Sequence, residues 1–458
     1  MEEDIQKRQM SPKPAGSSEI VKQRLQHAIE KGSERLDYEA AHDQSLLHAL
    51  SVVETFIKRK KRICYGGTAM NAILPEHKRF YDPNTDLPDF DFYTPEVDKD
   101  VDELVEDLLK EGYEDVYHKV GIHAGTKKIL VNFVAVADIS AITPELFAIM
   151  YRRSINHGGM HYTDPDILRM MMYLEISRPK GMLSRWDKVF ERLQIINSEF
   201  PIRAGCKDSG EIQQIYKSLI PTDIRTKILE YAIQHGRILC NGPIAAIYSK
   251  GIRHGNAQFK VGPGGPLLFT SPDPMVDILA VKGLLNDDRL TLYKHPERSD
   301  LVPLRIEIRM SDMPICMFIN ETACHSLNQI PLNDGRKINI GSLEFLISLY
   351  LSMEIFTNHS RDYLGDKIMC QVKKFIQLSS NNHKAKKSQF EPFSLKCQGH
   401  QVGYASLLKA KMLRAKKEKN KGGKKATRRA SASGTRKIST PATKKALGTK
   451  KALGSKKR

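Results

Sequence analysis

The stretch from Cys64 to Thr94 constrains the fold more than any other part of this 458-residue chain. It begins at a Gly66-Gly67 pair and runs on to the alternating sequence Asp89-Phe90-Asp91-Phe92-Tyr93. Side chains alternate across a strand, so this pattern predicts a strand that buries the phenylalanines and presents both aspartates on its other face. The two aspartate Cα atoms would lie about 6 to 7 Å apart on a rigid support. Such a pair suits the sharing of divalent metal ions.

The residues before that strand predict a turn that binds phosphate. Residues 61–65 are expected to form a short strand that enters Gly66-Gly67, where missing Cβ atoms let backbone N–H groups approach phosphate oxygens. Thr68 opens an expected helix over residues 69–74, and a helix N-terminus also favours anions. A glycine pair before a helix is more often an ordinary tight turn. The prediction of a phosphate-binding turn therefore depends on the acids that follow.

A third carboxylate is expected near the first two. Two-metal sites for nucleotidyl transfer hold ions about 3.5 to 4 Å apart, shared by several acidic side chains. The apolar run at residues 127–138 is predicted as a strand that ends with Asp138, and its apolar neighbours argue against an incidental surface acid. Alternation alone is also typical of a strand with one solvated face. The ordered set of glycine turn, Asp89, Asp91 and Asp138 favours a metal-dependent active site.

In this order, the segments resemble the polymerase-β-type nucleotidyltransferase superfamily. Within it, the chain is similar to the poly(A) polymerase catalytic subunits of large cytoplasmic DNA viruses, of the poxvirus-like and giant-virus type. The similar segments are 65–72, 88–93, 131–139, 166–179 and 184–189, within a resemblance that covers about residues 40–360. The resemblance implies an α/β (α+β) fold, with a mixed sheet in a nucleotidyltransferase domain and a second, degenerate nucleotidyltransferase-like domain after it.

The resemblance also implies residue roles and a reaction. Asp89, Asp91 and Asp138 are expected to be catalytic and to bind the metal ions, Mg²⁺ or Mn²⁺. The expected nucleotide-binding residues are Gly66, Gly67, Thr68, Asn71, Arg178 and Lys188. The implied enzyme is a polynucleotide adenylyltransferase, which transfers AMP from ATP to the 3′-hydroxyl of single-stranded mRNA without a template and releases pyrophosphate.

Two alternatives remain open. The chain could be a nucleotidyltransferase that uses another nucleotide or acceptor, or a catalytically inactive RNA-binding subunit. Basic residues in the helical region 144–196, among them Arg178, Arg185, Lys188 and Arg192, could reach a triphosphate or the primer backbone. Most charges on a helix face, however, only meet water.

Four parts are predicted along the chain. Residues 1–40 form a partly helical N-terminal extension, 41–200 the catalytic domain, 201–408 the degenerate domain and 409–458 a disordered basic tail. The second domain is predicted to be a decayed copy of the first, because Cys240, Gly242 and Ala245 line up with Cys64, Gly66 and Ala69. Pro243 then replaces the second glycine, and Cys324 stands where Asp138 would be, so one active centre is expected per chain. Chance similarity is the alternative explanation.

The basic tail accounts for the net charge of the chain. Residues 409–458 carry 20 Lys or Arg and one acid, which equals the formal charge of +19 of the whole sequence. The tail is of low complexity and is not expected to fold alone. Sequence-independent binding to RNA or DNA phosphates is the favoured role, and a solubilising or nuclear-import-like extension is the alternative.

Composition also bears on the compartment and on partners. The seven cysteines are scattered without a Cys-x-x-Cys pair, which predicts reduced thiols and no zinc site, and His157 and His161 are assigned to a polar loop. No secretory signal or apolar run long enough to span a membrane is expected. The resemblance implies the host cytoplasm, at the viral factory, and the virion, with a homodimer or a viral processivity subunit as partner. The apolar helix at 343–356 is expected in the core, with a subunit interface as the alternative.

Overall fold

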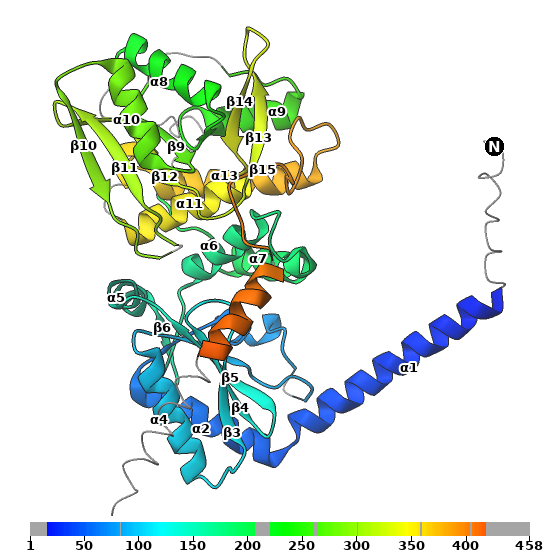
Figure 1. Cartoon of the computed structure of the whole chain (residues 1–458). Helices are drawn as coiled ribbons and strands as arrows, with labels where there is room; N and C mark the ends of the chain where they lie inside the picture. The colour runs from blue at the N-terminus through cyan, green and yellow to red at the C-terminus, as the bar shows by residue number, and fades with distance from the viewer. Residues whose placement is uncertain are drawn as a thin grey trace, which may run out of the picture. The chain divides into compact units, whose positions relative to one another are not determined.

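The computed structural model describes residues 16–417, apart from 83, 207–219, 260–263, 300, 358–359 and 404. These residues form two mixed β-sheets with helices packed around them (Figure 1). This arrangement confirms the predicted α/β (α+β) class with two sheet-containing halves. The described residues up to Lys411 make up one compact unit, and those from Met412 belong to another. The predicted domain boundaries remain predictions, and most of the predicted basic tail lies outside the described residues.

The first sheet has seven strands in the order β3-β4-β5-β2-β1-β7-β6. Its strands are β1 (Ile63–Tyr65), β2 (Phe90–Thr94), β3 (Val116–Val120), β4 (Thr126–Val131), β5 (Val134–Ala141), β6 (Ile155–His157) and β7 (Met160–Tyr162). β2 runs parallel to β5 and antiparallel to β1, and β1 runs parallel to β7. The loop predicted around His157 and His161 is therefore wrong, because these residues lie in the β6–β7 hairpin.

The single strand predicted for residues 127–138 is also wrong. The chain reverses at Asn132 and Phe133, whose φ angles are 49° and 68°, so that β4 and β5 form an antiparallel hairpin. Asp138 consequently lies in the middle of β5 rather than at the end of a strand. The hairpin brings β4 alongside the acid-bearing strand.

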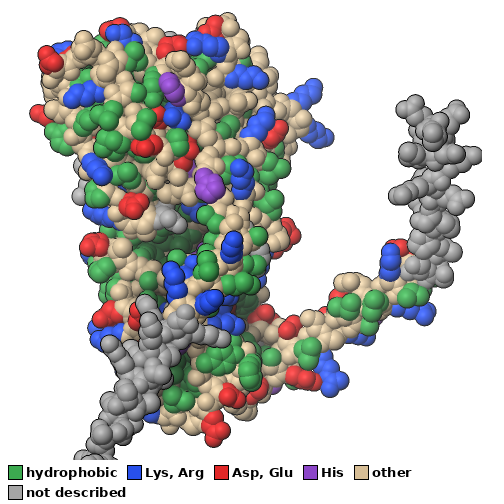
Figure 2. All heavy atoms as spheres, viewed as in Figure 1, with side chains coloured by type: hydrophobic (Ala, Val, Ile, Leu, Met, Phe, Trp, Pro, Cys, Tyr) green, Lys and Arg blue, Asp and Glu red, His purple; other side chains and the backbone are tan. Residues whose placement is uncertain are grey.

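The first half of the described chain also contains helices, which pack on the first sheet except for α1, which projects away from it. They are α1 (Gly16–Ala41), α2 (Gln44–Lys60), α3 (Gly66–Ile73), η1 (Glu76–Lys78), α4 (Val97–Lys110), α5 (Pro144–Arg153), α6 (Pro165–Ile176), η2 (Leu183–Arg185) and α7 (Trp186–Glu199). Phe90 and Phe92 are buried in a core with residues of α2 and α4, as the alternation predicted. Residues 19–39 of α1 are exposed, with apolar and charged side chains along its length (Figure 2).

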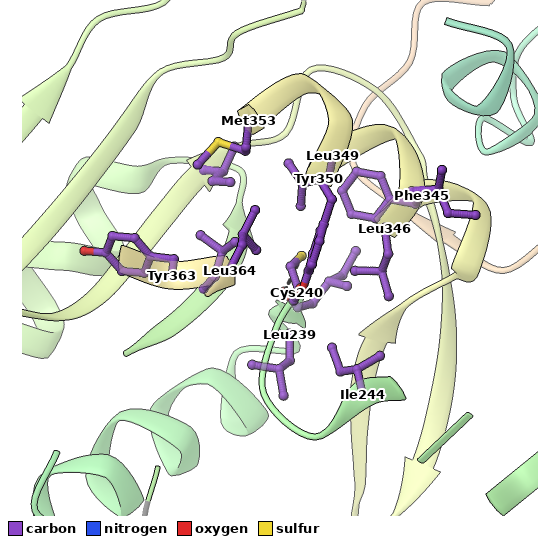
Figure 3. Close-up of a cluster of buried hydrophobic side chains, with 14 of the residues drawn as sticks. Leu239, Cys240, Ile244, Phe345, Leu346, Leu349, Tyr350, Met353, Tyr363 and Leu364 are labelled. Atoms are coloured by element: carbon purple, nitrogen blue, oxygen red, sulfur yellow. Dashed lines mark hydrogen bonds between the residues drawn. The ribbon is translucent and has the colours of Figure 1, made fainter. Parts of the chain in front are cut away.

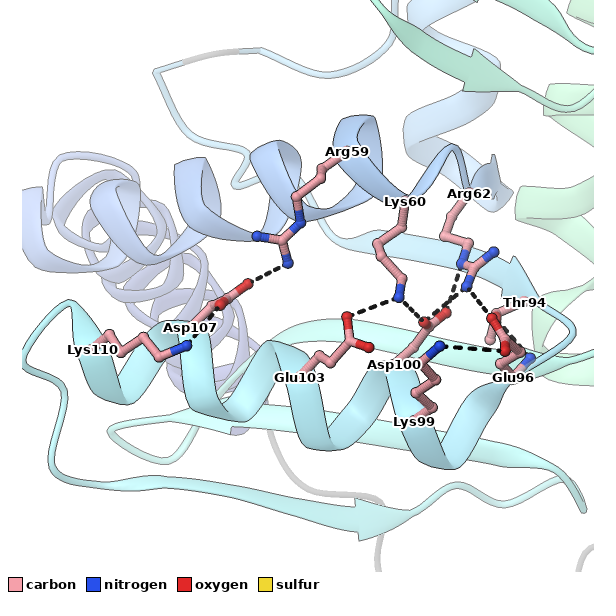
Figure 4. Close-up of polar contacts among 10 residues, drawn as sticks. All are labelled: Arg59, Lys60, Arg62, Thr94, Glu96, Lys99, Asp100, Glu103, Asp107 and Lys110. Atoms are coloured by element: carbon pink, nitrogen blue, oxygen red, sulfur yellow. Dashed lines mark hydrogen bonds and ion pairs between the residues drawn. The ribbon is translucent and has the colours of Figure 1, made fainter. Parts of the chain in front are cut away.

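A charged network joins α2, β1 and α4 behind this sheet (Figure 4). The Arg62 guanidinium donates to both carboxylate oxygens of Asp100, at 2.7 and 2.9 Å, and Asp100 is fully buried. Lys60 lies 3.5 Å from the same carboxylate and 2.8 Å from Glu103. The network fixes the start of β1, and thereby the position of the glycine turn that follows.

The second sheet has eight strands in the order β10-β11-β12-β9-β8-β14-β13-β15. They are β8 (Ile238–Leu239), β9 (Leu267–Ser271), β10 (Leu290–His295), β11 (Arg305–Met310), β12 (Met313–Asn320), β13 (His325–Pro331), β14 (Lys337–Gly341) and β15 (Cys397–Gln398). The helices around it are α8 (Thr222–Gln234), α9 (Ile244–His254), α10 (Pro274–Leu285), α11 (Leu343–Phe356), α12 (Ser360–Leu364) and α13 (Ile368–Lys384). Nearly all of α11 is buried, which confirms the predicted core helix.

The two sheets repeat one topology. Strands β1 to β7 and β8 to β14 occur in corresponding places, and every neighbouring pair has the same parallel or antiparallel sense. The buried ion pair also recurs, because Arg237 binds Asp277 on α10 as Arg62 binds Asp100 on α4. The shared strand order supports the predicted duplication over chance similarity.

The strand register corrects the predicted alignment of the copies. Cys64 pairs with Phe92 in the first sheet, and Leu239 pairs with Phe269 in the second, so Cys64 corresponds to Leu239 and not to Cys240. The extra residue Asn241 before Gly242 accounts for the shift by one position. Cys324 does not correspond to Asp138 either, because it follows β12 and is disulfide-bonded to Cys397.

The positions that match the acids are apolar in the second copy. Phe92 pairs with Ile139 as Phe269 pairs with Phe318, so Asp91 and Asp138 correspond to Leu268 and Met317. On the neighbouring strand β11, Glu307 is the cross-strand partner of Met317. The Glu307 carboxylate accepts a hydrogen bond from the buried Tyr363 hydroxyl. Figure 3 shows Tyr363 and Leu364 beside the apolar cluster around Tyr350 and Cys240. The second sheet therefore carries apolar side chains at the two positions where the first sheet carries Asp91 and Asp138.

Four of the seven cysteines form disulfides, so the prediction of reduced thiols is wrong for them. Cys206 is bonded to Cys370, and Cys324 to Cys397. Cys64, Cys240 and Cys316 are free and buried. None of the described helices is long and apolar enough to cross a membrane.

Candidate active site

The carboxylates of the predicted site come from two neighbouring parallel strands. Asp91 on β2 is the direct cross-strand partner of Asp138 on β5, so both side chains lie on the same face of the sheet. Asp89 immediately precedes β2, and its carbonyl accepts a hydrogen bond from the Asp91 N–H at 3.1 Å. The structure therefore places Asp91 and Asp138 side by side on adjacent strands, with Asp89 at the start of β2.

The glycine turn meets this acid face. Helix α3 begins at Gly66, whose φ of +74° favours glycine, and a Cβ atom there would collide with the Asp91 carboxylate. A Cβ atom at Gly67 would collide with the hydroxyl of Tyr81. Both positions require glycine because the Asp91 carboxylate and the Tyr81 hydroxyl approach the backbone closely. The N-terminus of α3 therefore lies beside Asp91.

Two of the predicted nucleotide-binding residues, Thr68 and Asn71, form hydrogen bonds within the protein that connect α3 to neighbouring segments. The Thr68 hydroxyl donates to the Asp89 carbonyl at 2.8 Å and so ties α3 to the acid segment. The Asn71 side-chain oxygen accepts hydrogen bonds from the N–H groups of Phe80 and Tyr81, at 2.8 and 3.2 Å. In this conformation, both side chains support the turn and the loop beside it.

The acids influence one another's protonation. The pKa of Asp91 is raised to about 7 by burial and by the neighbouring carboxylates of Asp89 and Asp138. Burial and the Asp138 carboxylate also raise the pKa of Asp89. Lys128 and Arg185 oppose the rise at Asp91, and the Lys128 ammonium lies 2.5 Å from one oxygen of Asp138. Crowded carboxylates of this kind gain when a cation binds between them.

The donor set fits a divalent metal ion in its chemistry. The other oxygen of Asp138 is buried and has no hydrogen-bond partner. The pKa of Asp91 is raised first by burial and then by the charges of Asp89 and Asp138, which a cation would offset. Carboxylate oxygens are the ligands that Mg²⁺ and Mn²⁺ prefer. Within the described ranges, no three His, Cys, Asp or Glu side chains are grouped closely enough to hold a metal ion in this conformation. Asp91 and Asp138 are the ligand pair that the fold places side by side.

The two basic residues predicted to bind nucleotide lie on other segments of the chain than the acids. Arg178 lies near His325 of the second sheet, whose pKa is lowered to about 3, first by burial and then by the Arg178 charge. Lys188 is exposed on α7. Their roles in nucleotide binding remain predictions.

Other basic groups lie closer to the acids and the turn. Lys128 contacts Asp138, and Arg185 acts electrostatically on Asp91. The sequence does not single out Lys128, because its position beside Asp138 depends on the β4–β5 hairpin. Arg185 is predicted only as one of several basic residues in a helical region.

Tyr81 and Arg192 form a pair directly over the glycine turn. Arg192 donates to the Tyr81 hydroxyl at 3.1 Å, and its guanidinium stacks on the Phe80 ring with 4.5 Å to the ring centre. A Cβ atom at Gly67 would be 2.9 Å from a guanidinium nitrogen of Arg192. A cation is thus held where a triphosphate would meet the turn, and no sequence pattern singled out Tyr81.

Comparison with known proteins supports the resemblance. Residues 51–182 match the family model of the poly(A) polymerase catalytic subunit, and this segment contains both the turn and the acids. A protein of Acanthamoeba polyphaga mimivirus named "Putative poly(A) polymerase catalytic subunit" is 30% identical over 218 residues, which cover 45% of this chain and 36% of that protein. A protein of the same name from African swine fever virus (isolate Tick/Malawi/Lil 20-1/1983) is 31% identical over 160 residues, or 34% of this chain and 33% of that one. The chain thus spans about a third of the length of these relatives.

The fold has a solved counterpart. The crystal structure of the Megavirus polyadenylate synthase superposes with a TM-score of 0.69 at 19% identity, over 90% of this chain and 86% of that one. The similarity confirms the mixed α/β fold.

Proposed function

We propose that the chain is a polynucleotide adenylyltransferase that extends the 3′ end of single-stranded RNA with AMP from ATP. The observation that carries the proposal is the adjacency of Asp91 and Asp138 on parallel strands, with the Gly66-Gly67 turn packed against Asp91. The match of residues 51–182 to the viral poly(A) polymerase family supports the same reaction. ATP, the RNA and a divalent ion, Mg²⁺ or Mn²⁺, are the corresponding substrates and cofactor.

In this proposal, the acids and the glycine turn have different roles. Asp91 and Asp138, with Asp89, would hold the metal, which when bound activates the RNA 3′-hydroxyl and stabilises the charge of the triphosphate. The backbone at Gly66 and Gly67, at the start of α3, accommodates phosphate oxygens closely and favours their negative charge. Much of the acceleration would come from in-line positioning of the hydroxyl and from fixed charges around the phosphates.

The second copy contributes no such centre in this proposal. Its positions equivalent to Asp91 and Asp138 are Leu268 and Met317, which cannot ligate Mg²⁺ through oxygen. One active centre per chain follows. A homodimer or a viral processivity subunit as partner, and the host cytoplasm and virion as location, are further proposals that rest on the viral relatives.

Primer extension tests the proposal directly. The full-length chain is incubated with labelled single-stranded RNA, Mg²⁺ or Mn²⁺, and each nucleoside triphosphate separately. We expect long products with ATP alone, and their loss by at least 10³-fold in Asp91→Asn with Asp138→Asn, because the paired ligands are removed. Asp102→Asn, which removes an exposed acid on α4, is the matched control.

The other outcomes identify the alternatives. Extension with every nucleotide would keep the site and reassign the product to a less selective nucleotidyltransferase. RNA binding without extension under any condition would instead favour a retired RNA-binding subunit.

A further inference from the structure

A row of charged side chains crosses the first sheet on the face of the acids. Asp91 pairs with Asp138, Asp138 with Lys128, and Lys128 with Lys119 on the outer strand β3. Direct cross-strand partners project to the same face, so the row runs from two carboxylates to two ammonium groups. Neighbouring strands are about 4.8 Å apart, which places Lys119 about 10 Å from Asp138 across the sheet. Lys119 is exposed and forms no ion pair with the described residues.

Two exposed aromatic rings continue this row. Tyr117 lies two residues before Lys119 and therefore on the same face. Its ring packs edge-on against Phe133 at the tip of the β4–β5 hairpin, with the ring centres 6.0 Å apart. Phe133 is 75% exposed and Tyr117 38%. Since β5 runs parallel to β2, this tip lies at the end of the sheet where Asp89 and the glycine turn are found.

Folding does not favour an aromatic residue at this tip. Asn132 and Phe133 both have positive φ, the conformation of a two-residue hairpin turn in which glycine is strongly preferred at the second position. A bulky side chain there is strained, and most of its ring meets water. The ring thus adds little packing to compensate for the strain, which points to a role outside the fold.

We propose that Lys119, Tyr117 and Phe133 bind the nucleotides just upstream of the RNA 3′ end. The ammonium group would contact backbone phosphates, and the two rings would stack on bases, the combination by which proteins grip single strands without sequence preference. The proposal rests on the proposed function, because the 3′-terminal nucleotide must sit at Asp91 and Asp138. It assigns the outer strands of the first sheet to the primer, at a distance from the triphosphate turn.

Phe133→Gly is the decisive variant. It removes the ring and places the favoured residue in the turn, so the protein should be at least as stable as the parent in thermal unfolding. We expect its affinity for a labelled ten-nucleotide oligo(A) to fall at least about fivefold in fluorescence anisotropy, because stacking is lost. Binding of a two-nucleotide primer should be unchanged, since it does not reach the tip.

Lys119→Gln tests the charged part. It should weaken binding of the ten-nucleotide RNA and lower the slope of log affinity against log salt by about 0.7, the value for one phosphate contact on a single strand. Leu109→Ala and Lys99→Gln on α4, which remove an exposed apolar and an exposed charged side chain there, are the matched controls.

The outcomes separate this inference from the proposed function. If RNA affinity and salt slope are unchanged in both variants while ATP-dependent extension proceeds, the subsite is refuted and the enzyme stands. If Phe133→Gly changes only the oligomeric state in light scattering, the tip is a protein contact and the proposal falls. If extension is absent but long RNA binds less tightly to both variants, the subsite stands without the proposed activity.

Discussion

At the scale of single residues, Asp91 combines a functional position with a cost to folding. Its pKa is raised to about 7, so the folded protein keeps a proton that the unfolded chain loses near pH 4. The folded state therefore binds more protons between these values, and stability falls as pH rises from about 4 to 7. In the proposed function, a metal ion bound beside Asp91 would offset this cost.

Asp91→Asn should remove this cost. We expect the metal-free variant to gain on the order of 2 kcal/mol in free energy of unfolding at pH 8 and little at pH 4, because the charged form is the unfavourable one. Urea unfolding with a chelator at both pH values measures the difference. An equal effect at both pH values would show that the carboxylate does not titrate as described.

At the scale of elements, the network between α2, β1 and α4 is the strongest polar link behind the active site. Asp100→Asn should lower the free energy of unfolding by about 3 to 5 kcal/mol, because the buried Arg62 guanidinium then keeps only the half-exposed Glu96 carboxylate as a counter-charge. Thermal or urea unfolding provides the measurement.

The same helices offer a matched control for that substitution. Asp107→Asn breaks the pair with the half-exposed Arg59 and should cost no more than about 1 kcal/mol. Similar losses from both substitutions would mean that burial does not decide the strength of these pairs.

The elements also show how far sequence patterns reach. Helices such as α2 and α4, and strand β2, were predictable because their apolar period matches a buried face. Helix α11 was predictable because it is apolar along nearly its whole length. The β4–β5 hairpin was missed because Asn132-Phe133 lacks the glycine that marks a tight turn. That single error also hid the contact of Lys128 with Asp138. The acids and glycines carry their own motif, whereas Tyr81 and Arg192 meet the turn only through tertiary packing.

At the scale of the whole molecule, two disulfides join segments far apart in the chain, with sequence separations of 164 and 73 residues. Protein purified without reductant and unfolded should therefore show three reactive thiols, and seven after reduction. Titration with a thiol reagent in denaturant makes the count. Seven thiols before reduction would contradict the structure and restore the expectation from the scattered cysteine spacing.

The duplication was visible in the sequence, but its register was not. A similar glycine turn revealed the repeat, yet one extra residue at Asn241 displaced the alignment, and the acid-equivalent positions emerged only from strand pairing. A sequence motif shows that similar residues occur in both copies. The pairing of residues between neighbouring strands shows which positions of the two copies are equivalent.

The repeated topology gives this chain an internal reference for its own chemistry. The buried pairs Arg62–Asp100 and Arg237–Asp277 occupy equivalent places, one behind an acid-lined face and one behind an apolar face. The same substitution made in each half of one molecule would separate what the scaffold requires from what catalysis requires.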